Sequence, residues 1–374
     1  MTSKLILLIS FVSISWLKAQ TVSTVTEGTI TDGLGIDSQG NIYGSDFGGD
    51  TVYKYNPTTG EVSVFQTGFS NPNGIGVNSD DEVFVCDHTG NTIYMYDTSG
   101  NLLDTFTGFT TPTGIKETPD MDGYMLVVEY QANRIKLLDA DIGDVEVLVS
   151  GSPLNGPAGI AYIGNTPYIG NFNDRKIFRL DNYDTLVEIA QLPATAAGSN
   201  FLGFLTAKGG FLFATQLGEH KIYRIDPVSG EVVLFAGSVA GGDDGPLEDA
   251  TFNLPNGILA DEANDRLYIS DAQPKNLRII DGVTLGANDN RIIINELKLF
   301  PNPPQDALML QGKLPAGAYQ VFVYDTLGSR LLSQKMDVLQ GQIYSEIDVS
   351  RLPSGTYVLE LSKGNIAISK KFVK

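Results

Sequence analysis

The chain has 374 residues, a formal net charge of −19 and a single cysteine. The charge is uneven: residues 20–295 carry 14 basic and 37 acidic side chains, a net charge of −23. So acidic a body repels nucleic acid and anionic membrane surfaces and favours cations or cationic partners, although the same charge also serves solubility. One cysteine, Cys86, cannot form an internal disulfide, so burial of apolar side chains must stabilise the fold.

Residues 1–19 have the pattern of an export signal. Lys4 supplies the charged start, Leu5 to Leu17 form the apolar stretch, and Ala19 precedes the expected cleavage site. The apolar stretch is shorter than the roughly 20 residues that a membrane-spanning helix needs. We therefore predict a signal peptide and no transmembrane span.

From residue 20 to residue 285 a short pattern returns six times, most clearly as Asn71-Pro72-Asn73-Gly74-Ile75. Its glycines lie 40 to 54 residues apart, a period typical of a propeller or solenoid. Each repeat holds four strand-like runs separated by turns, which predicts an all-β fold with six blades. The glycines should let the innermost strands converge on a narrow axis. They are Gly33, Gly74, Gly114, Gly159, Gly203 and Gly257.

The sixth repeat lacks a good fourth strand after Asp281. Residues 21–28, at the start of the mature chain, align with the outer strand of the first repeat, residues 61–68. An open blade would expose an unpaired edge. We therefore predict that residues 21–26 pair with the third strand of the last blade and close the ring.

The repeats resemble those of NHL-repeat propellers and of the related gluconolactonase-like (senescence-marker) propellers over residues 20–285. The stretch Ala236 to Pro246, followed by Ala250 to Ile258, is similar to the long entry into an NHL blade. The resemblance implies a six-bladed β-propeller. It implies little about function, because such scaffolds host unrelated activities.

After a linker over residues 286–295, residues 296–374 follow a single-copy pattern. Short alternating strands separated by glycine and proline turns predict a small β-sandwich. The opening Leu299-Phe300-Pro301-Asn302-Pro303 and the basic end Lys370 to Lys374 resemble the C-terminal sorting domain of the bacterial type IX secretion system. That resemblance implies recognition by the translocon and export to the cell surface or the medium. The alternative is an accessory sandwich that stays attached.

Three residues that precede repeated glycines should meet at one mouth of the axial channel. They are Asn256, Asp32 and Asn73, from blades six, one and two. Carboxylate and amide oxygens are hard ligands that suit calcium. Because gluconolactonase-like proteins hold a divalent ion on the axis, the resemblance implies a divalent-cation site at these residues. The alternative is that they cap turns through local hydrogen bonds.

A second ring of polar residues follows the second strand of each blade. It could form an acidic funnel or bond the backbone of neighbouring turns. His88 is a candidate base facing the channel, and with two histidines the chain cannot form a three-histidine zinc site. The ring comprises Asp46, Asp87, Glu129, Asn171, Gln216 and Asp271.

The sequence thus favours an exported propeller that binds a small-molecule, glycan or protein ligand. A competing hypothesis is a metal-dependent lactone hydrolase or lyase of the gluconolactonase-like class, in which the ion polarises a carbonyl group and positions water. A third is a purely structural adhesive module. Whether the protein is an enzyme stays open at this point.

Overall fold

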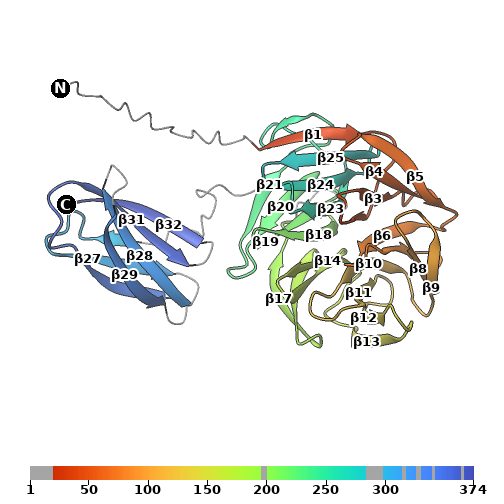
Figure 1. Cartoon of the computed structure of the whole chain (residues 1–374), viewed down its shortest axis with the longest axis horizontal. Coiled ribbons are helices and arrows are strands. Elements are labelled where there is room, and N and C mark those ends of the chain that lie inside the picture. The colour runs from red at the N-terminus through yellow and green to blue at the C-terminus, as the bar shows by residue number, and fades with distance from the viewer. Residues whose placement is uncertain are drawn as a thin grey trace, which may run out of the picture. The chain divides into compact units, whose positions relative to one another are not determined.

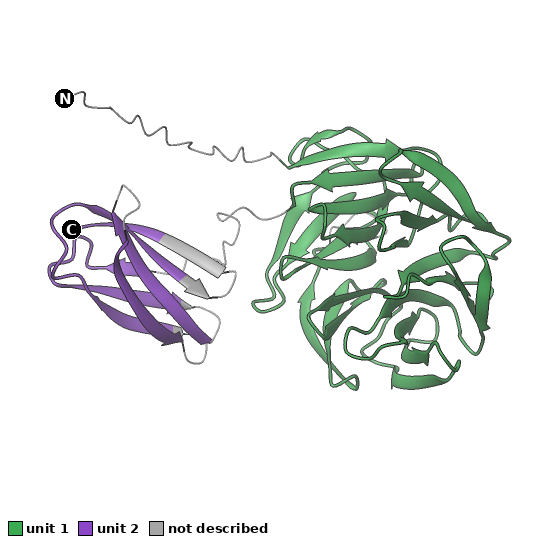
Figure 2. Ribbon diagram, in the orientation of Figure 1, with its two compact units in different colours: residues 1–284 green, residues 285–374 purple. Residues whose placement is uncertain are grey.

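The computed structural model describes residues 20–194, 200–283, 298–313, 317–325, 330–338, 342–363 and 366–374. The chain divides into two compact units, residues 1–284 and residues 285–374 (Figure 2). The predicted signal peptide and the predicted linker over residues 286–295 lie outside the described residues.

Every regular element in the described residues is a β-strand, and the first unit is the expected six-bladed propeller (Figure 1). No helix among the described residues is long and apolar enough to cross a membrane.

Blades one to five are four-stranded sheets whose strands follow one another in chain order. Blade one contains β2 (Leu34–Ile36), β3 (Ile42–Ser45), β4 (Thr51–Asn56) and β5 (Glu61–Thr67). Blade two contains β6 (Pro72–Val77), β7 (Val83–Asp87), β8 (Thr92–Tyr96) and β9 (Leu102–Phe106). Blade three contains β10 (Pro112–Glu117), β11 (Tyr124–Glu129), β12 (Arg134–Asp139) and β13 (Val145–Ser150). Blade four contains β14 (Pro157–Ile163), β15 (Thr166–Asn171), β16 (Lys176–Asp181) and β17 (Thr185–Gln191). Blade five contains β18 (Leu202–Lys208), β19 (Phe211–Gln216), β20 (Lys221–Ile225) and β21 (Val232–Ala236).

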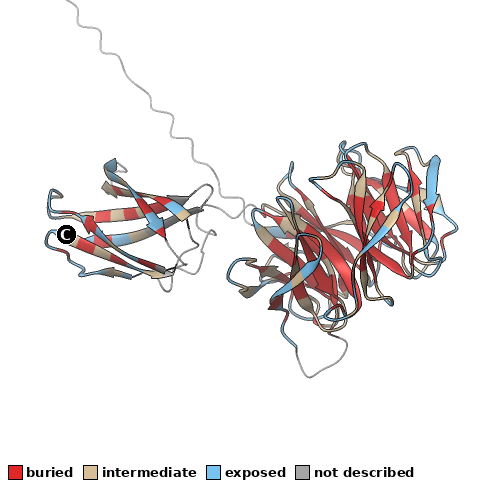
Figure 3. Cartoon of the chain, turned by 90° about the horizontal axis from the view of Figure 1, so that it is seen from below, coloured by how far each residue is buried: buried red, intermediate tan, exposed pale blue. Residues whose placement is uncertain are grey.

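Burial decreases from the axis outward (Figure 3). In blade two every residue of β7 is buried, whereas the outer strand β9 is exposed except at Phe106. The apolar core lies between neighbouring blades, where Phe84 and Cys86 of blade two pack with Met125 and Val127 of blade three. This packing explains why the second strands read as continuous apolar runs, because both of their faces are covered.

Blade six confirms the predicted ring closure. The N-terminal strand pairs with the third strand of this blade, and Val22, opposite Ile280, is only 2% exposed. The short strand Gly245–Pro246, which precedes blade six in the chain, pairs with the outer edge of the N-terminal strand. The amide and hydroxyl groups of Thr24 both donate hydrogen bonds to the carboxylate of Asp244. The closing strand therefore has partners on both edges. The order is β22 (Gly245–Pro246), β1 (Thr21–Thr26), β25 (Asn276–Asp281), β24 (Arg266–Asp271) and β23 (Pro255–Asp261).

The repeated glycines are where adjacent blades touch at the axis. A Cβ added at Gly74 would overlap the carbonyl oxygen of Thr113 in the next blade. The same holds at the seam of the ring, where a Cβ on Gly257 would overlap the carbonyl of Asp32. Glycine is therefore required here for close backbone approach.

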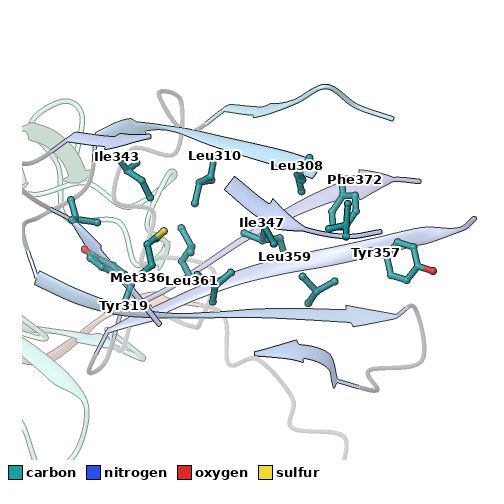
Figure 4. Packing of buried hydrophobic residues seen from close by; sticks show 14 residues of the cluster. Leu308, Leu310, Tyr319, Met336, Ile343, Ile347, Tyr357, Leu359, Leu361 and Phe372 are labelled. Atoms are coloured by element: carbon teal, nitrogen blue, oxygen red, sulfur yellow. The ribbon is translucent and has the colours of Figure 1, made fainter. Parts of the chain in front are cut away.

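The second unit is a β-sandwich, as the sequence predicted. Side chains of both sheets fill its core, with Leu308 and Ile347 on one side and Val321, Leu359 and Phe372 on the other (Figure 4). One sheet has the order β26 (Lys298–Phe300), β27 (Ala307–Lys313) and β30 (Gln342–Asp348). The other has the order β29 (Arg330–Val338), β28 (Gly317–Asp325), β31 (Thr356–Lys363) and β32 (Ile366–Val373).

We predict that Gly74→Ala destabilises the propeller by ~1–3 kcal/mol, the usual cost of overpacking a filled site. Gly48→Ala is the matched control, because an added Cβ there meets nothing within 4 Å. Denaturant unfolding of the two full-length variants would measure the difference. Equal stability of both variants would show that the axis can widen without cost.

Candidate functional site

A pocket of about 310 Å³ lies at one end of the propeller axis. Its inner wall comes from all six blades, mostly from residues that precede repeated glycines: Asp32, Asn73, Thr113, Ala158, Gly203, Phe204 and Asn256. Its outer wall comes from residues that each directly follow a member of the second polar ring: Phe47, His88, Tyr130, Phe172 and Leu217. The predicted candidates Asp32, Asn73, Asn256 and His88 are therefore brought together in one cavity.

β-Bulges place the inner-wall residues. In blade three Pro112 pairs with Glu129 and Gly114 with Val128, so Thr113 is an extra residue on its strand. Ala158 occupies the same position in blade four. A bulge breaks the regular alternation of side chains and re-aims the extra residue. Here the extra residue contributes to the pocket wall.

Apolar side chains close the axis beyond the pocket. The six residues that follow the repeated glycines all line a second cavity of about 30 Å³, roughly the volume of one water molecule in the liquid. Phe204 borders both cavities. The pocket is therefore a cup with an apolar floor. The six residues are Leu34, Ile75, Ile115, Ile160, Phe204 and Ile258.

Two buried oxygen atoms of the inner wall lack hydrogen-bond partners. They are the Oδ1 atoms of Asp32 and Asn73, whose side chains belong to residues only 5% and 6% exposed. Burial raises the pKa of Asp32 to about 8, and the charge of Asp46 acts in the same direction. Hydrogen bonds from the Gly33 backbone and the Asn256 side chain oppose the rise. The carboxyl group is therefore kept in a site that disfavours its charge.

Asn256 is oriented differently from Asp32 and Asn73. Its side chain bonds Asp32, while its Oδ1 lies against Gly203, 2.6 Å from where a Cβ would stand. In this orientation Asn256 offers its amide hydrogen atoms to Asp32. Two of the three predicted ligands thus present unpartnered oxygen atoms. The described part of the chain holds no group of three or more His, Cys, Asp or Glu side chains that could bind a metal ion.

Aromatic rings follow one another along the outer wall. The ring centroids of Phe47 and His88 are 5.6 Å apart, those of His88 and Tyr130 6.0 Å, and those of Tyr130 and Phe172 5.7 Å. Phe172 in turn stacks on Phe201 at 4.4 Å. We call Phe47, His88, Tyr130 and Phe172 the aromatic arc. Phe47, Tyr130 and Phe172 were not among the residues predicted from the sequence, although each directly follows a residue of the second polar ring.

His88 lies within hydrogen-bonding reach of the inner wall. Its Nδ1 is 3.2 Å from Oγ1 of Thr113, whose hydroxyl group also donates to the carbonyl of Thr111. Burial lowers the pKa of His88, and its interactions with the Pro112 carbonyl and with Asp87 oppose the shift. A neutral imidazole can exchange a proton with a bound molecule or donate a hydrogen bond to it.

The second polar ring holds loops in place and is absent from the lining of the pocket. Most of its members bond the segment that enters their own blade, as the structural alternative predicted. Asp46 accepts from the Thr31 hydroxyl group of that segment and also pairs with Lys275 of the neighbouring blade. Asp87 accepts from the amides of Ser70, Asn71 and Gly90, Glu129 from Thr110, and Asp271 from Asn253, while Asn171 and Gln216 donate to the carbonyls of Pro153 and Pro193.

Comparison with known proteins identifies the second unit. Residues 298–374 match the family model described as a secretion system C-terminal sorting domain. The C-terminal unit is a type IX sorting domain. Its presence indicates engagement of the type IX secretion machinery, so the protein is exported to the cell surface or secreted.

The propeller has the fold of several solved structures. An auxiliary nutrient binding protein from Bacteroides thetaiotaomicron superposes with a TM-score of 0.58 at 19% identity, covering 70% of this chain and 76% of that one. A gluconolactonase from Xanthomonas campestris superposes with a TM-score of 0.55 at 16% identity, covering 71% and 90%. The expected fold relationship is confirmed.

One curated relative is the chloroplastic protein Suppressor of quenching 1 of Arabidopsis thaliana. It is 27% identical over 246 residues, which span 64% of this chain and 21% of the plant protein. The chain therefore matches about a fifth of that relative's length.

We predict that Asp32→Asn stabilises the propeller, and more so at pH 8 than at pH 5. The pKa of Asp32 is about 8 in the folded protein and near 3.8 when the chain is unfolded. Below pH 3.8 both states are protonated, so ionisation of this group contributes nothing to the difference in stability. As the pH rises towards 8, the unfolded chain loses its proton first and the folded protein is progressively destabilised, by up to ~1.4 kcal/mol per pH unit.

Melting curves of Asp32→Asn and of the exposed control Asp104→Asn at the two pH values would check this. A gain at Asp32 that does not depend on pH would contradict the assignment.

Proposed function

We propose that the protein is an exported binding protein whose axial pocket captures a small organic ligand. The observation that carries the proposal is the pairing, in one cup, of two unpartnered buried oxygen atoms with an arc of aromatic rings. A volume of about 310 Å³ is within the range of small-molecule sites, which are mostly apolar with a few convergent polar groups.

The unpartnered oxygen atoms favour a binding role over a purely structural one. A buried polar atom without a partner costs ~1–3 kcal/mol. In Asp32 and Asn73 the two atoms concerned belong to neighbouring blades and to one pocket. A bound molecule that supplies hydrogen-bond donors would satisfy both atoms at once and recover that cost.

The lactone hydrolase remains a second candidate, supported by the same oxygen atoms. Oδ1 of Asp32 and Oδ1 of Asn73 are hard oxygen ligands of the kind that calcium prefers. A divalent ion held by these two oxygen atoms would supply a Lewis acid for a carbonyl group, and the predicted third ligand Asn256 would join them only after its side-chain amide rotates away from Gly203. His88 lines the same pocket and would take up a proton from water at its ring nitrogen.

Filling the pocket tests the binding role. We predict that Leu217→Trp abolishes the rise in melting temperature that a bound molecule causes, because the indole occupies the cup. Leu103→Trp on the outer strand β9, where Leu103 is 47% exposed, is the matched control.

The probes would be monosaccharides, sugar lactones, aromatic amines and quaternary ammonium ions. We expect at least one class of probe to raise the melting temperature of the wild-type protein and of Leu103→Trp but not that of Leu217→Trp. The proposal would be contradicted if no probe raised the melting temperature of any of the three proteins, or if the probes raised all three melting temperatures equally.

Calcium binding tests the hydrolase. If the ion is held in the pocket, Asp32→Ala removes a calcium-dependent rise in melting temperature, whereas Asp104→Ala retains it, because a ligand that binds only the folded state stabilises it. Hydrolysis of D-glucono-1,5-lactone above the spontaneous rate would accompany the rise. Calorimetry showing that the full chain binds neither calcium nor magnesium would refute both the metal site and the hydrolase.

A further inference from the structure

Resting on the proposed binding role of the axial pocket, we propose that its ligand is an organic cation, a substituted ammonium group carried on a small apolar body. The charged nitrogen would face Asp32 and Asn73 on the inner wall. The substituents around it would contact the aromatic arc.

The unsatisfied groups of the pocket call for a donor or a positive charge. Both unpartnered oxygen atoms, Oδ1 of Asp32 and Oδ1 of Asn73, are acceptors when the carboxyl group is ionised. Among the described residues that line the pocket there is no lysine or arginine, so an anionic ligand would meet no counter-charge. The pocket therefore favours cations over carboxylates or phosphates.

One carboxyl group matches one positive charge: burial raises the pKa of Asp32, and a cation bound beside it would favour the ionised form. Asp32 is the sole acidic residue of the lining that the structure describes. Asp46, whose charge acts on Asp32, already pairs with Nζ of Lys275 at 2.8 Å. A monovalent ammonium group would leave the buried pair neutral, whereas a divalent ion would leave an excess charge in a desolvated site.

The volume also favours an organic ion over a bare one. The volume of the pocket, about 310 Å³, is roughly ten times the volume that one water molecule occupies in the liquid. An apolar floor and four rings surround this space. A metal ion alone would leave most of that apolar surface without a partner, whereas an organic body would cover it.

The aromatic arc is suited to a positively charged nitrogen. Aromatic faces carry negative potential and attract cations within about 6 Å of the ring centroid, which is how aromatic cages recognise quaternary ammonium groups. Contacts between the rings hold the arc in shape, and the hydroxyl group of Tyr130 donates to Oδ1 of Asn173 at 3.0 Å. The side chains are therefore positioned before a ligand arrives, which lowers the entropic cost of binding.

The charge of the whole propeller acts in the same direction. Its net charge of −23 concentrates cations around it and raises their association rate, an effect that salt weakens. An anion approaching the pocket would have to overcome that field.

Isothermal titration calorimetry of the full chain with choline, benzyltrimethylammonium and 3,3-dimethyl-1-butanol would test the proposal. The first two carry a permanent charge, and the third is the uncharged carbon isostere of choline. We expect both cations to bind and the isostere to bind at least about tenfold more weakly. This is the loss of affinity expected when a desolvated cation–π contact is removed.

Two pairs of variants locate the interaction. Tyr130→Leu should lower the affinity for both cations about tenfold. Tyr344→Leu, at a 70% exposed position of the sorting domain, should leave both affinities unchanged. Asp32→Asn should lower the affinity for the cations without changing the affinity for the isostere, whereas Asp104→Asn should leave both affinities unchanged. Circular dichroism would verify that Tyr130→Leu is folded, and Asp32→Asn is a second variant that retains the shape of the pocket.

The outcomes separate this inference from the proposed function. Equal affinity for choline and its isostere, or binding of calcium alone, would overturn the cation proposal. Binding of a sugar or lactone that Leu217→Trp abolishes, without binding of either cation, would also overturn it while leaving the binding role intact. If no probe binds, both fail.

Discussion

Close contact between glycine and a neighbouring backbone carbonyl at the axis is the constraint on which the rest of the propeller depends. Gly74 faces the carbonyl of Thr113, and around the ring Gly257 faces that of Asp32. Five such approaches, and one of Gly159 to the amide nitrogen of Leu205, let the innermost strands converge until apolar side chains fill the axis. The inter-blade cores, the ring closure by β1 and the closed floor of the pocket all require this spacing.

The same constraint builds the pocket. Five of the inner-wall residues directly precede a repeated glycine whose contact holds the backbone, and in blades three and four this residue sits in a β-bulge. The backbone at these positions is therefore held by packing, while the side chain is left to vary. Asp32, Thr113 and Ala158 occupy equivalent places with very different chemistry, so specificity can change there without disturbing the ring.

Stability and binding oppose each other at this site. Asp32 is a carboxyl group with its pKa raised by burial, and Oδ1 of Asn73 is buried without a partner. In the second polar ring, the carboxylate of Asp87 accepts hydrogen bonds from backbone amides, whereas one oxygen atom each of Asn171 and Gln216 is also buried without a partner. The two unpartnered oxygen atoms of Asp32 and Asn73 differ from these because both belong to residues that line the pocket. The sorting domain is a separate unit with its own core, and its role in export is independent of what the pocket binds.

The sequence by itself determined the repeat number, the closure of the ring by residues 21–26, and the sorting domain. These features are encoded locally, in the period of glycines, in alternating apolar residues and in single-copy motifs. It also placed Asp32, Asn73 and Asn256 at one mouth, because equivalent positions of a repeat meet in a ring, and it gave His88 as a candidate facing the channel. Only the tertiary structure decided which oxygen atoms lack partners, how Asn256 turns towards Gly203, and that Phe47, Tyr130 and Phe172 form an arc with His88. Those outcomes depend on bulges and on packing between blades some forty residues apart, and no local pattern encodes such contacts.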